Sequence, residues 1–438
     1  MISFGKWLAR IRSTTPTYFS IKCASDAREP FVSSYEFSTA LPPGALTANG
    51  ARLQRSMPSW RKASIIAIAT FLAACTSVPL PPASTPESVP ASPAGARPGD
   101  AATLPPPRLL QKSRWMPVAW SDLPGFGEDS LFEAWNAWIK SCERPGPVFA
   151  PLCGEVRRLS IASPQDQRDW MVARLQPYRV ESLQGSAEGL LTSYYEPVLR
   201  ASRRPGSGYE VPLYRTPATL ANRKPWFSRQ EIDTLPEARA ALRGREIAWV
   251  DDPVEVMSLH IQGSGRLNIQ EPDGSQRTVR VAYAGSNEQP FRSVTQWLFE
   301  QGEGKMVAPW VESTKAWAFK NPQRVQQMLW SNPRYTFFQE QPLSEFDAGF
   351  GPRGAQGVPL TPGRSIAVDP GSIPYGTPVW LASRGGAANL QKLVLAQDTG
   401  SAIVGAVRAD YFAGTGVDAG LLASRVNQPL RLWALWPK

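Results

Sequence analysis

Three features of the sequence predict a mainly β fold. The chain of 438 residues contains 43 prolines and 34 glycines, which is too many for a bundle of helices. Short runs rich in Val, Leu and Ile alternate with turn signals such as Pro272-Asp273-Gly274. Hydrophobic residues make up 42% of the chain and charged residues 19%, so it can bury one large core or two modest ones.

The N-terminal part is expected to be absent from the mature protein. Residues 1–56 show no apolar periodicity and are predicted to be an over-extended, disordered N-terminus. Residues 57–75 have the order of an export signal, with the basic pair Arg61-Lys62 followed by an apolar run that is too short to cross a bilayer. Its end, Leu72-Ala73-Ala74-Cys75, resembles a lipobox, in which Cys75 receives lipid. The alternative is a buried apolar helix with a chance cysteine.

The expected loss of the N-terminal part changes both the net charge and the number of cysteines in the mature protein. Much of the net charge of +10 lies in residues 1–62, so the mature chain has a small positive excess and gives little reason to expect nucleic acid. Of the four cysteines, Cys23 lies in the leader and Cys75 is the lipidation site. Cys142 and Cys153 are expected to form a disulfide, or else to be two reduced buried thiols.

The remaining chain divides into a tether and a folded part. Residues 76–108 are dominated by Pro, Ala and Ser and are predicted to be an extended linker. Helices are predicted at 131–141 and 164–175, and one or two more between Phe291 and Trp330. Strands are predicted at residues 189–195, 254–261, 277–283, 365–368, 378–381, 393–396 and 430–435.

Elimination leaves carboxylate chemistry. The chain has one histidine, His260, in an alternating run that predicts a strand-face residue. A Ser-His-Asp triad, a histidine zinc site or a Cys-His nucleophile would need partners that this chain scarcely supplies. Gly263-Ser264-Gly265 lacks the lysine and the helix of a phosphate loop. No cofactor and no metal are therefore expected.

Three aspartates follow or lie within short apolar strands near the C-terminus. Asp369 and Asp398 each end an apolar strand at a turn, and Asp410 follows Val407-Arg408-Ala409. Strand-end carboxylates of this kind can converge on one cleft. The alternative for each is an Asx-turn, in which the carboxylate only caps its own backbone.

Several tracts in a fixed order resemble the membrane-bound lytic murein transglycosylase A family, whose C-terminal half is a three-aspartate (3D) domain. The resemblance spans roughly residues 189–437 and includes the three aspartates. The tracts ahead of them are Ser193-Tyr194-Tyr195-Glu196-Pro197-Val198 with Val211-Pro212-Leu213-Tyr214-Arg215-Thr216-Pro217, Leu259-His260-Ile261-Gln262-Gly263-Ser264-Gly265-Arg266-Leu267, Tyr283-Ala284-Gly285, and Asn332-Pro333-Arg334-Tyr335-Thr336-Phe337-Phe338.

The resemblance implies a fold of two β-barrels and a set of site residues. A double-psi β-barrel would be built from residues 109–218 and 339–438, with a second β-barrel inserted at 219–338 and a substrate groove between them. Asp410 takes the catalytic position, and Asp398 and Asp369 match the two aspartates that support it. The residues implied to bind sugar are Gln262, Ser264, Gly265 and Tyr195. The sequence departs from the family at Ser401 and Val404, where glycine and lysine are common.

The activity implied is that of a lyase that breaks the β-1,4 bond between N-acetylmuramic acid and N-acetylglucosamine and leaves 1,6-anhydromuramyl ends, in cell-wall remodelling and recycling. The implied location is the periplasmic face of the outer membrane, through a lipid on Cys75. The implied partners are peptidoglycan strands and cell-wall synthesis or division proteins. Two alternatives remain: a hydrolase that uses two of the aspartates with water, and a non-catalytic peptidoglycan-binding lipoprotein.

Overall fold

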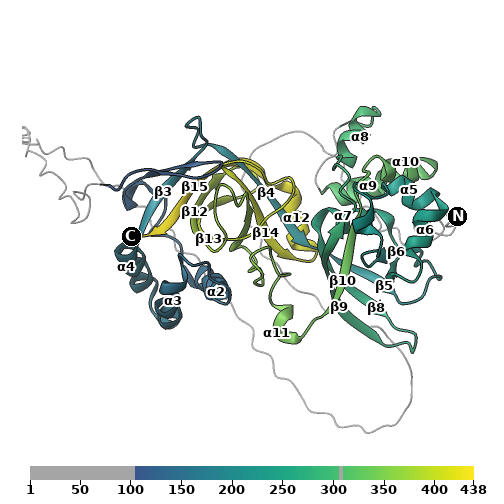
Figure 1. The fold of residues 1–438 in the computed structure, drawn as a ribbon, viewed down its shortest axis with the longest axis horizontal. Helices are drawn as coiled ribbons and strands as arrows, with labels where there is room; N and C mark the ends of the chain where they lie inside the picture. Colours follow the sequence, from purple (N-terminus) through teal and green to yellow (C-terminus); the bar gives the residue numbers. More distant parts are fainter. Residues whose placement is uncertain (1–103, 305–308) are drawn as a thin grey trace, which may run out of the picture. The chain divides into compact units, whose positions relative to one another are not determined.

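The computed structural model describes residues 104–304 and 309–438, which form a nine-stranded and a six-stranded sheet with flanking helices (Figure 1). This confirms the mainly β fold. The expected leader, the signal segment with Cys75 and most of the linker lie outside the described residues. The bounds expected for the domains stay a prediction.

Six strands of the nine-stranded sheet close into a barrel. Their order is β15-β12-β13-β11-β14-β4, and β4 pairs in turn with β15. Apolar side chains from all six strands fill the interior. These strands are β4 (Gly189–Glu196), β11 (Ser365–Val368), β12 (Pro378–Arg384), β13 (Asn389–Asp398), β14 (Arg408–Thr415) and β15 (Asn427–Pro437). The sheet continues from β15 through β3 (Leu175–Glu181), β2 (Arg114–Pro117) and β1 (Arg108–Leu109).

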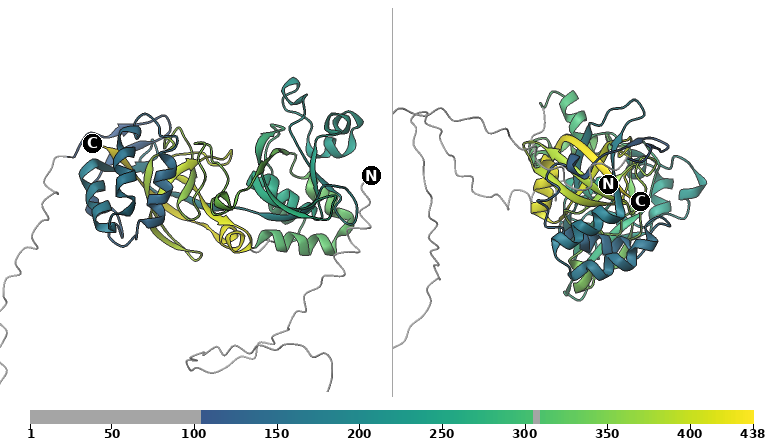
Figure 2. Two further views of the ribbon diagram at one scale, coloured as in Figure 1. Left: turned by 90° about the horizontal axis from the view of Figure 1, so that it is seen from below. Right: turned by 90° about the vertical axis from the view of Figure 1, so that its left-hand side faces the viewer.

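Three helices pack beside this barrel: α2 (Phe132–Ser141), α3 (Cys153–Arg158) and α4 (Pro164–Arg174) (Figure 2). The fully buried Trp135 and Trp138 belong to the apolar cluster that α2 shares with β12, β13 and β15. The predicted helices at 131–141 and 164–175 are thereby confirmed, and Ser163 caps α4 by accepting a hydrogen bond from the Asp166 amide. A disulfide joins Cys142 to Cys153.

The second sheet has the order β10-β9-β8-β5-β7-β6, so β10 and β6 are its edge strands. The strands are β5 (Val198–Ser202), β6 (Val211–Tyr214), β7 (Glu246–Val250), β8 (Ser264–Gln270), β9 (Gln276–Ser286) and β10 (Thr336–Pro342). The helices that accompany it are α5 (Arg229–Thr234), α6 (Pro236–Leu242), α7 (Pro253–Gln262), α8 (Val294–Glu300), α9 (Trp310–Lys320) and α10 (Val325–Trp330). Two short helices, α11 (Glu345–Ala348) and α12 (Val417–Arg425), belong to the C-terminal part.

Glu196 marks the place where the chain leaves the barrel and enters the six-stranded sheet. Its carboxylate is fully buried and accepts hydrogen bonds from Arg266 Nε on β8 at 2.8 Å and Arg280 Nε on β9 at 2.6 Å. Thr415 at the end of β14 also donates to Glu196, at 2.8 Å. A buried carboxylate with this many charged donors is satisfied, and removal of one partner is strongly destabilising.

The strand predicted at 254–261 is wrong, because this segment is helix α7. Asp252 caps the helix by accepting from the amides of Val254 and Glu255, Pro253 occupies the first turn, and Gly263 ends the helix in the left-handed region with φ 80°. Because most of the helix is buried, it lacks the single apolar face of a surface helix, so the helical period was not recognised. His260 is therefore a buried helix residue and not a strand-face residue, and Arg229 donates to its Nδ1 at 2.9 Å. Burial lowers the pKa of His260 well below its usual value, with a further contribution from the charge of Arg229.

The region between Phe291 and Trp330 contains more helices than the one or two predicted. The described residues there form three α-helices, α8, α9 and α10. Each contributes buried residues to one apolar cluster with α7, including Leu298, Trp317 and Met328. The short breaks between the helices carry little periodic signal, which explains why they were not separated. The other predicted strands are confirmed within β4, β9, β11, β12, β13 and β15.

Candidate active site

Strand register brings two of the three aspartates into one row. Ala367 on β11 pairs with Asp398 on β13 at one side and with Asp410 on β14 at the other. Asp410 pairs in turn with Thr192 on β4. Adjacent strands are about 4.8 Å apart, so the backbones of the two aspartates are separated by about 10 Å across β11.

The row faces outward from the barrel. Ile366 and Val368 on β11, and Ala409 and Tyr411 on β14, belong to the interior apolar cluster. Because successive side chains on a strand point to opposite faces, the residues between them face the other way. Asp410 therefore stands on the outer wall of the barrel, where its side chain is partly exposed.

Asp410 is held by a short chain of hydrogen bonds. Thr192 Oγ1 donates to Asp410 Oδ1, and Arg408 Nη2 donates to Thr192 Oγ1 at 2.8 Å. Burial raises the pKa of Asp410 and the charge of Asp398 raises it further, whereas Thr192 and Arg408 act in the opposite direction. The net effect is a carboxyl group that keeps its proton to higher pH than an ordinary aspartate.

Asp398 lies in the same row as Asp410, but different groups donate hydrogen bonds to its carboxylate. Tyr194 Oη donates to Asp398 Oδ2 at 2.8 Å, and the Ala355 amide donates to Oδ1 at 2.9 Å. Burial raises the pKa of Asp398 although these hydrogen bonds oppose the shift. Burial and the charge of Asp398 also keep the pKa of Tyr194 well above its usual value, so its hydroxyl remains a donor. The Tyr194 ring packs against Phe412, with centroids 5.3 Å apart.

Asp369 is bound by a separate set of donors. Its Oδ2 accepts from Lys112 Nζ and from the Gly405 amide, both at 2.9 Å, and its Oδ1 accepts from the Gly371 amide at 3.0 Å. Burial alone would raise the pKa of Asp369, but these donors outweigh it and lower the pKa below the usual value. The structure therefore brings Asp398 and Asp410 together, whereas Asp369 is hydrogen-bonded to Lys112 and to the amides of Gly371 and Gly405.

The residues expected to bind sugar lie where the barrel meets the six-stranded sheet. Gln262, the last residue of α7, accepts a hydrogen bond on Oε1 from the Tyr195 amide at 3.0 Å. Tyr195 also lines a cavity of about 110 Å³, together with Ser258 and Trp310. Ser264 is buried at the start of β8. A Cβ on Gly265 would lie 3.0 Å from the Pro197 carbonyl oxygen, so close packing requires a glycine there.

Sequence reasoning missed the groups that tune the two aspartates. Thr192 and Tyr194 alternate with the buried Leu191 on β4, and this alternation was the available signal that they share the outer face. Arg408 lies two residues before Asp410 in the sequence, but nothing in the sequence indicated its contact with Thr192. The Ala355 amide likewise could not be found from residue type. Within residues 104–304 and 309–438, no three His, Cys, Asp or Glu side chains are grouped so as to hold a metal ion.

Two family models match the chain. The MltA specific insert domain matches residues 190–339, and the 3D domain matches residues 364–436. The second match contains Asp369, Asp398 and Asp410.

Relatives and solved structures agree with these matches. The chain is 30% identical over 279 residues to membrane-bound lytic murein transglycosylase A of Escherichia coli strain K12, an alignment that covers 62% of this chain and 72% of the relative. Identity to the Vibrio cholerae protein of the same name is 28% over 256 residues, which covers 56% of this chain and less than two thirds, 65%, of that relative. The solved lytic transglycosylase LtgG of Burkholderia pseudomallei is 41% identical with a TM-score of 0.54, and the match covers 77% of this chain and 99% of that one.

Proposed function

The chain belongs to the membrane-bound lytic murein transglycosylase A family, and from this membership we propose that it cleaves peptidoglycan strands without water. The bond broken is the β-1,4 bond between N-acetylmuramic acid and N-acetylglucosamine. The product is a strand ending in a 1,6-anhydromuramyl ring. The C6 hydroxyl of the muramyl residue displaces the leaving sugar from C1 and no water is consumed, so the enzyme is classed as a lyase.

The observation that carries the proposal is the position of Asp410, beside Asp398 across β11 on the outer wall of the barrel, where burial raises its pKa. A protonated carboxyl can donate its proton to the glycosidic oxygen while the bond to C1 of the muramyl residue breaks. The carboxylate that remains then accepts the proton of the muramyl C6 hydroxyl as its oxygen bonds to C1. One residue thus acts as acid and then as base, and it returns to its starting protonation state.

Asp398 is assigned a supporting role in this scheme. Its charge is one of the causes that raise the pKa of Asp410, and its two oxygens are already bound by Tyr194 and Ala355. An ionised neighbour favours the protonated form of a carboxyl group. Asp398 therefore helps Asp410 to hold the proton that it must donate.

Asp369 is assigned to the support of the loop that precedes β14. Its hydrogen bonds with the amides of Gly405 and Gly371 fix the turn on each side, and Lys112 neutralises its charge. This role is positioning and not proton transfer, because an ionised carboxylate beside an ammonium group is a poor acid.

Sugar binding is assigned to Tyr195, Gln262, Ser264 and Gly265. The hydrogen bond from the Tyr195 amide to Gln262 supports this, because it joins the strand that carries Thr192 to the helix that ends beside β8. An aromatic ring and amide groups are the kinds of groups that hold sugar rings and hydroxyls.

The location proposed is the periplasmic face of the outer membrane, through a lipid on Cys75 and the linker 76–108. The relatives are named membrane-bound. In the described part of the chain, no helix has the length and apolar character needed to cross a membrane. We also propose that residues 219–338 are the inserted domain and that residues 109–218 and 339–438 form the barrel domain. The partners proposed are peptidoglycan strands and the proteins that build or divide the wall.

Mass analysis of the products tests the reaction type. Purified protein incubated with sacculi should release fragments that are lighter by one water than those of a hydrolase, because the anhydro ring forms in place of water addition. Reducing ends would instead support a hydrolase that uses Asp398 and Asp410 together. The absence of any soluble product, with binding to sacculi retained, would support a non-catalytic binding protein.

A further inference from the structure

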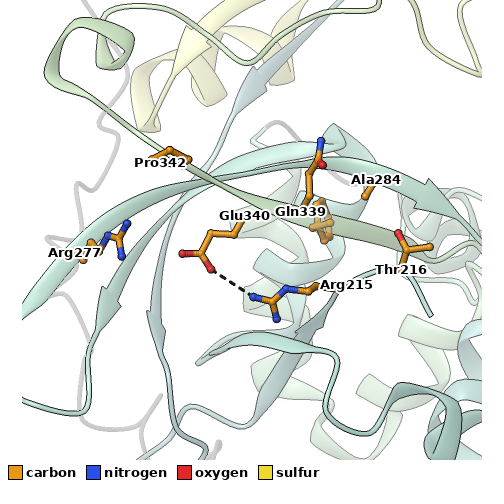
Figure 3. Close-up of a pocket in the computed structure, with 8 residues that line it drawn as sticks. Arg215, Thr216, Arg277, Ala284, Gln339, Glu340 and Pro342 are labelled. Carbon is orange, nitrogen blue, oxygen red and sulfur yellow. Dashed lines mark ion pairs between the residues drawn. The ribbon is translucent and has the colours of Figure 1, made fainter. Parts of the chain in front are cut away.

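A cavity of about 590 Å³ opens at the edge of the six-stranded sheet (Figure 3). None of the three aspartates of the candidate active site lines it. Its walls come from β10, from β9 and from the residues that follow β6. Strands β10 and β6 are the two ends of the sheet order, so each has an edge that is not paired with another strand of that sheet. The charged side chains in the lining are Arg215, Arg277 and Glu340.

The single carboxylate in this cavity is already bound. Arg203 holds Glu340 through two parallel hydrogen bonds, from Nη1 to Oε2 at 2.8 Å and from Nη2 to Oε1 at 2.7 Å. This hydrogen bond with Arg203 is the main cause that lowers the pKa of Glu340, with smaller contributions from the charges of Arg215 and Arg277. Glu340 is therefore ionised, and both of its oxygens accept hydrogen bonds from Arg203.

The two arginines in the lining keep free donors. Arg215 Nη1 donates to the Glu246 carbonyl oxygen at 2.8 Å, and its Nη2 forms an ion pair with Glu340 Oε2 at 3.7 Å, a distance too long for a hydrogen bond. Arg277 is exposed, and within the described residues its guanidinium makes no hydrogen bond or ion pair. Figure 3 shows the Arg215 and Arg277 side chains on either side of Glu340, with the ion pair between Arg215 and Glu340 marked.

Arg277 also lines a neighbouring hollow of about 580 Å³ with Arg203, Glu271 and Asp273. The carboxylates there are engaged as well, because Glu271 accepts from Arg203 Nε at 3.1 Å and Asp273 accepts from Ser275 Oγ at 2.7 Å. The guanidinium of Arg277 therefore lines both cavities, and the carboxylates of these cavities already have hydrogen-bond partners.

We propose that this cavity binds a carboxylate of the peptides that branch from the glycan substrate. The inference rests on the proposed function, because that substrate supplies the peptides. A guanidinium presents a planar fork of N–H donors that matches a carboxylate, and Arg277 and Arg215 both line this cavity. The cavity would act as a specificity site for peptide-bearing strands, separate from the residues that carry out the cleavage.

The test compares peptide-bearing glycan strands with the same strands after an amidase has removed the peptides. Arg277→Gln is expected to raise KM on peptide-bearing strands about fivefold, as for the loss of one exposed charge-assisted contact, with kcat unchanged. On peptide-free strands the variant should match the wild type. Arg243→Gln is the matched control, because Arg243 is an exposed arginine at the end of α6 that lines neither cavity.

Two results would overturn the inference: an unchanged KM on peptide-bearing strands, or an equal rise of KM on both substrates. Thermal unfolding of each variant checks that the fold is intact. If the wild type cleaves neither substrate, the proposed function fails by itself. Fluorescence titration with a soluble labelled muropeptide then still tests the site, because Arg277→Gln should weaken its binding about fivefold relative to Arg243→Gln.

Discussion

Two regions of the same barrel shift the pKa values of their carboxyl groups in opposite directions. At the outer wall, Asp398 and Asp410 are desolvated and receive hydrogen bonds from neutral donors, and their pKa values are raised. Around the turn after β11, Asp369 is more deeply buried but receives an ammonium and two amide donors, and its pKa is lowered. The comparison teaches that burial alone does not determine protonation: the charge and number of the donors decide it.

The largest effect is expected from a change at Asp410, one of the two aspartates with a raised pKa. Asp410→Asn should reduce release of anhydro-muropeptides about 10³-fold, because the amide can neither donate nor accept the transferred proton. The unfolding temperature at neutral pH should be equal or higher, since a carboxylate whose folded pKa is raised destabilises the fold when ionised. Product release is measured by chromatography with mass detection.

The control for this change is Asp418→Asn, which alters an exposed aspartate in the first turn of α12. It should cleave sacculi like the wild type. Cleavage by Asp410→Asn at a rate near that of the wild type would remove Asp410 from the mechanism.

The next largest effect is expected from a change at Asp369, the aspartate with a lowered pKa. Asp369→Asn should lower the free energy of unfolding by about 1–3 kcal/mol at neutral pH, because Lys112 loses its partner and the charged acceptor is gone. This contribution of Asp369 is present above the pKa of an unfolded aspartate, about 3.9, and is lost as pH falls through the lower folded pKa. Denaturant unfolding at pH 7 and at pH 3 should show a smaller difference between variant and wild type at the lower pH. A large fall in kcat without loss of stability would contradict the positioning role.

A smaller change sharpens the coupling between the two outer aspartates. Asp398→Asn removes a negative charge that raises the pKa of Asp410, so that pKa should fall. In the proposed mechanism, cleavage requires protonated Asp410, and the pH at which activity declines should therefore move to lower values. A shift of one pH unit corresponds to about a tenfold loss near neutral pH. The measurement is the pH profile of kcat/KM, and a shift toward higher pH would contradict this reasoning.

The smallest change acts through the hydroxyl that binds Asp410. Thr192→Val removes a hydrogen bond that favours the carboxylate, so the pKa of Asp410 should rise and the decline in activity should move to higher pH, opposite to Asp398→Asn. Activity at the optimum should fall only a few-fold, through poorer orientation of the carboxyl group. Thr192→Ser keeps the hydroxyl and should restore the wild-type profile; a profile that stays shifted in this variant would rule out the hydroxyl as the cause.

Much of the fold could be predicted because its signals are local. The β runs at residues 365–368 and 393–396 combine apolar residues with turns at their ends, and strands form there. The helix after Ser163 has its cap and its proline within the first two positions. At 254–261 the apolar alternation was given more weight than Asp252-Pro253 and Gly263, which are cap signals of comparable strength, and the prediction was wrong.

The sequence by itself determined the residue types at the candidate site: a single histidine and three aspartates close to strand ends led us to expect carboxylate chemistry. Only the tertiary structure decided which aspartates lie close together. Asp410 and its donor Thr192 are 218 positions apart, and Asp369 and Lys112 are 257 apart. These contacts depend on strand register and on the packing of distant segments, since a shift of one residue would turn each side chain to the opposite face.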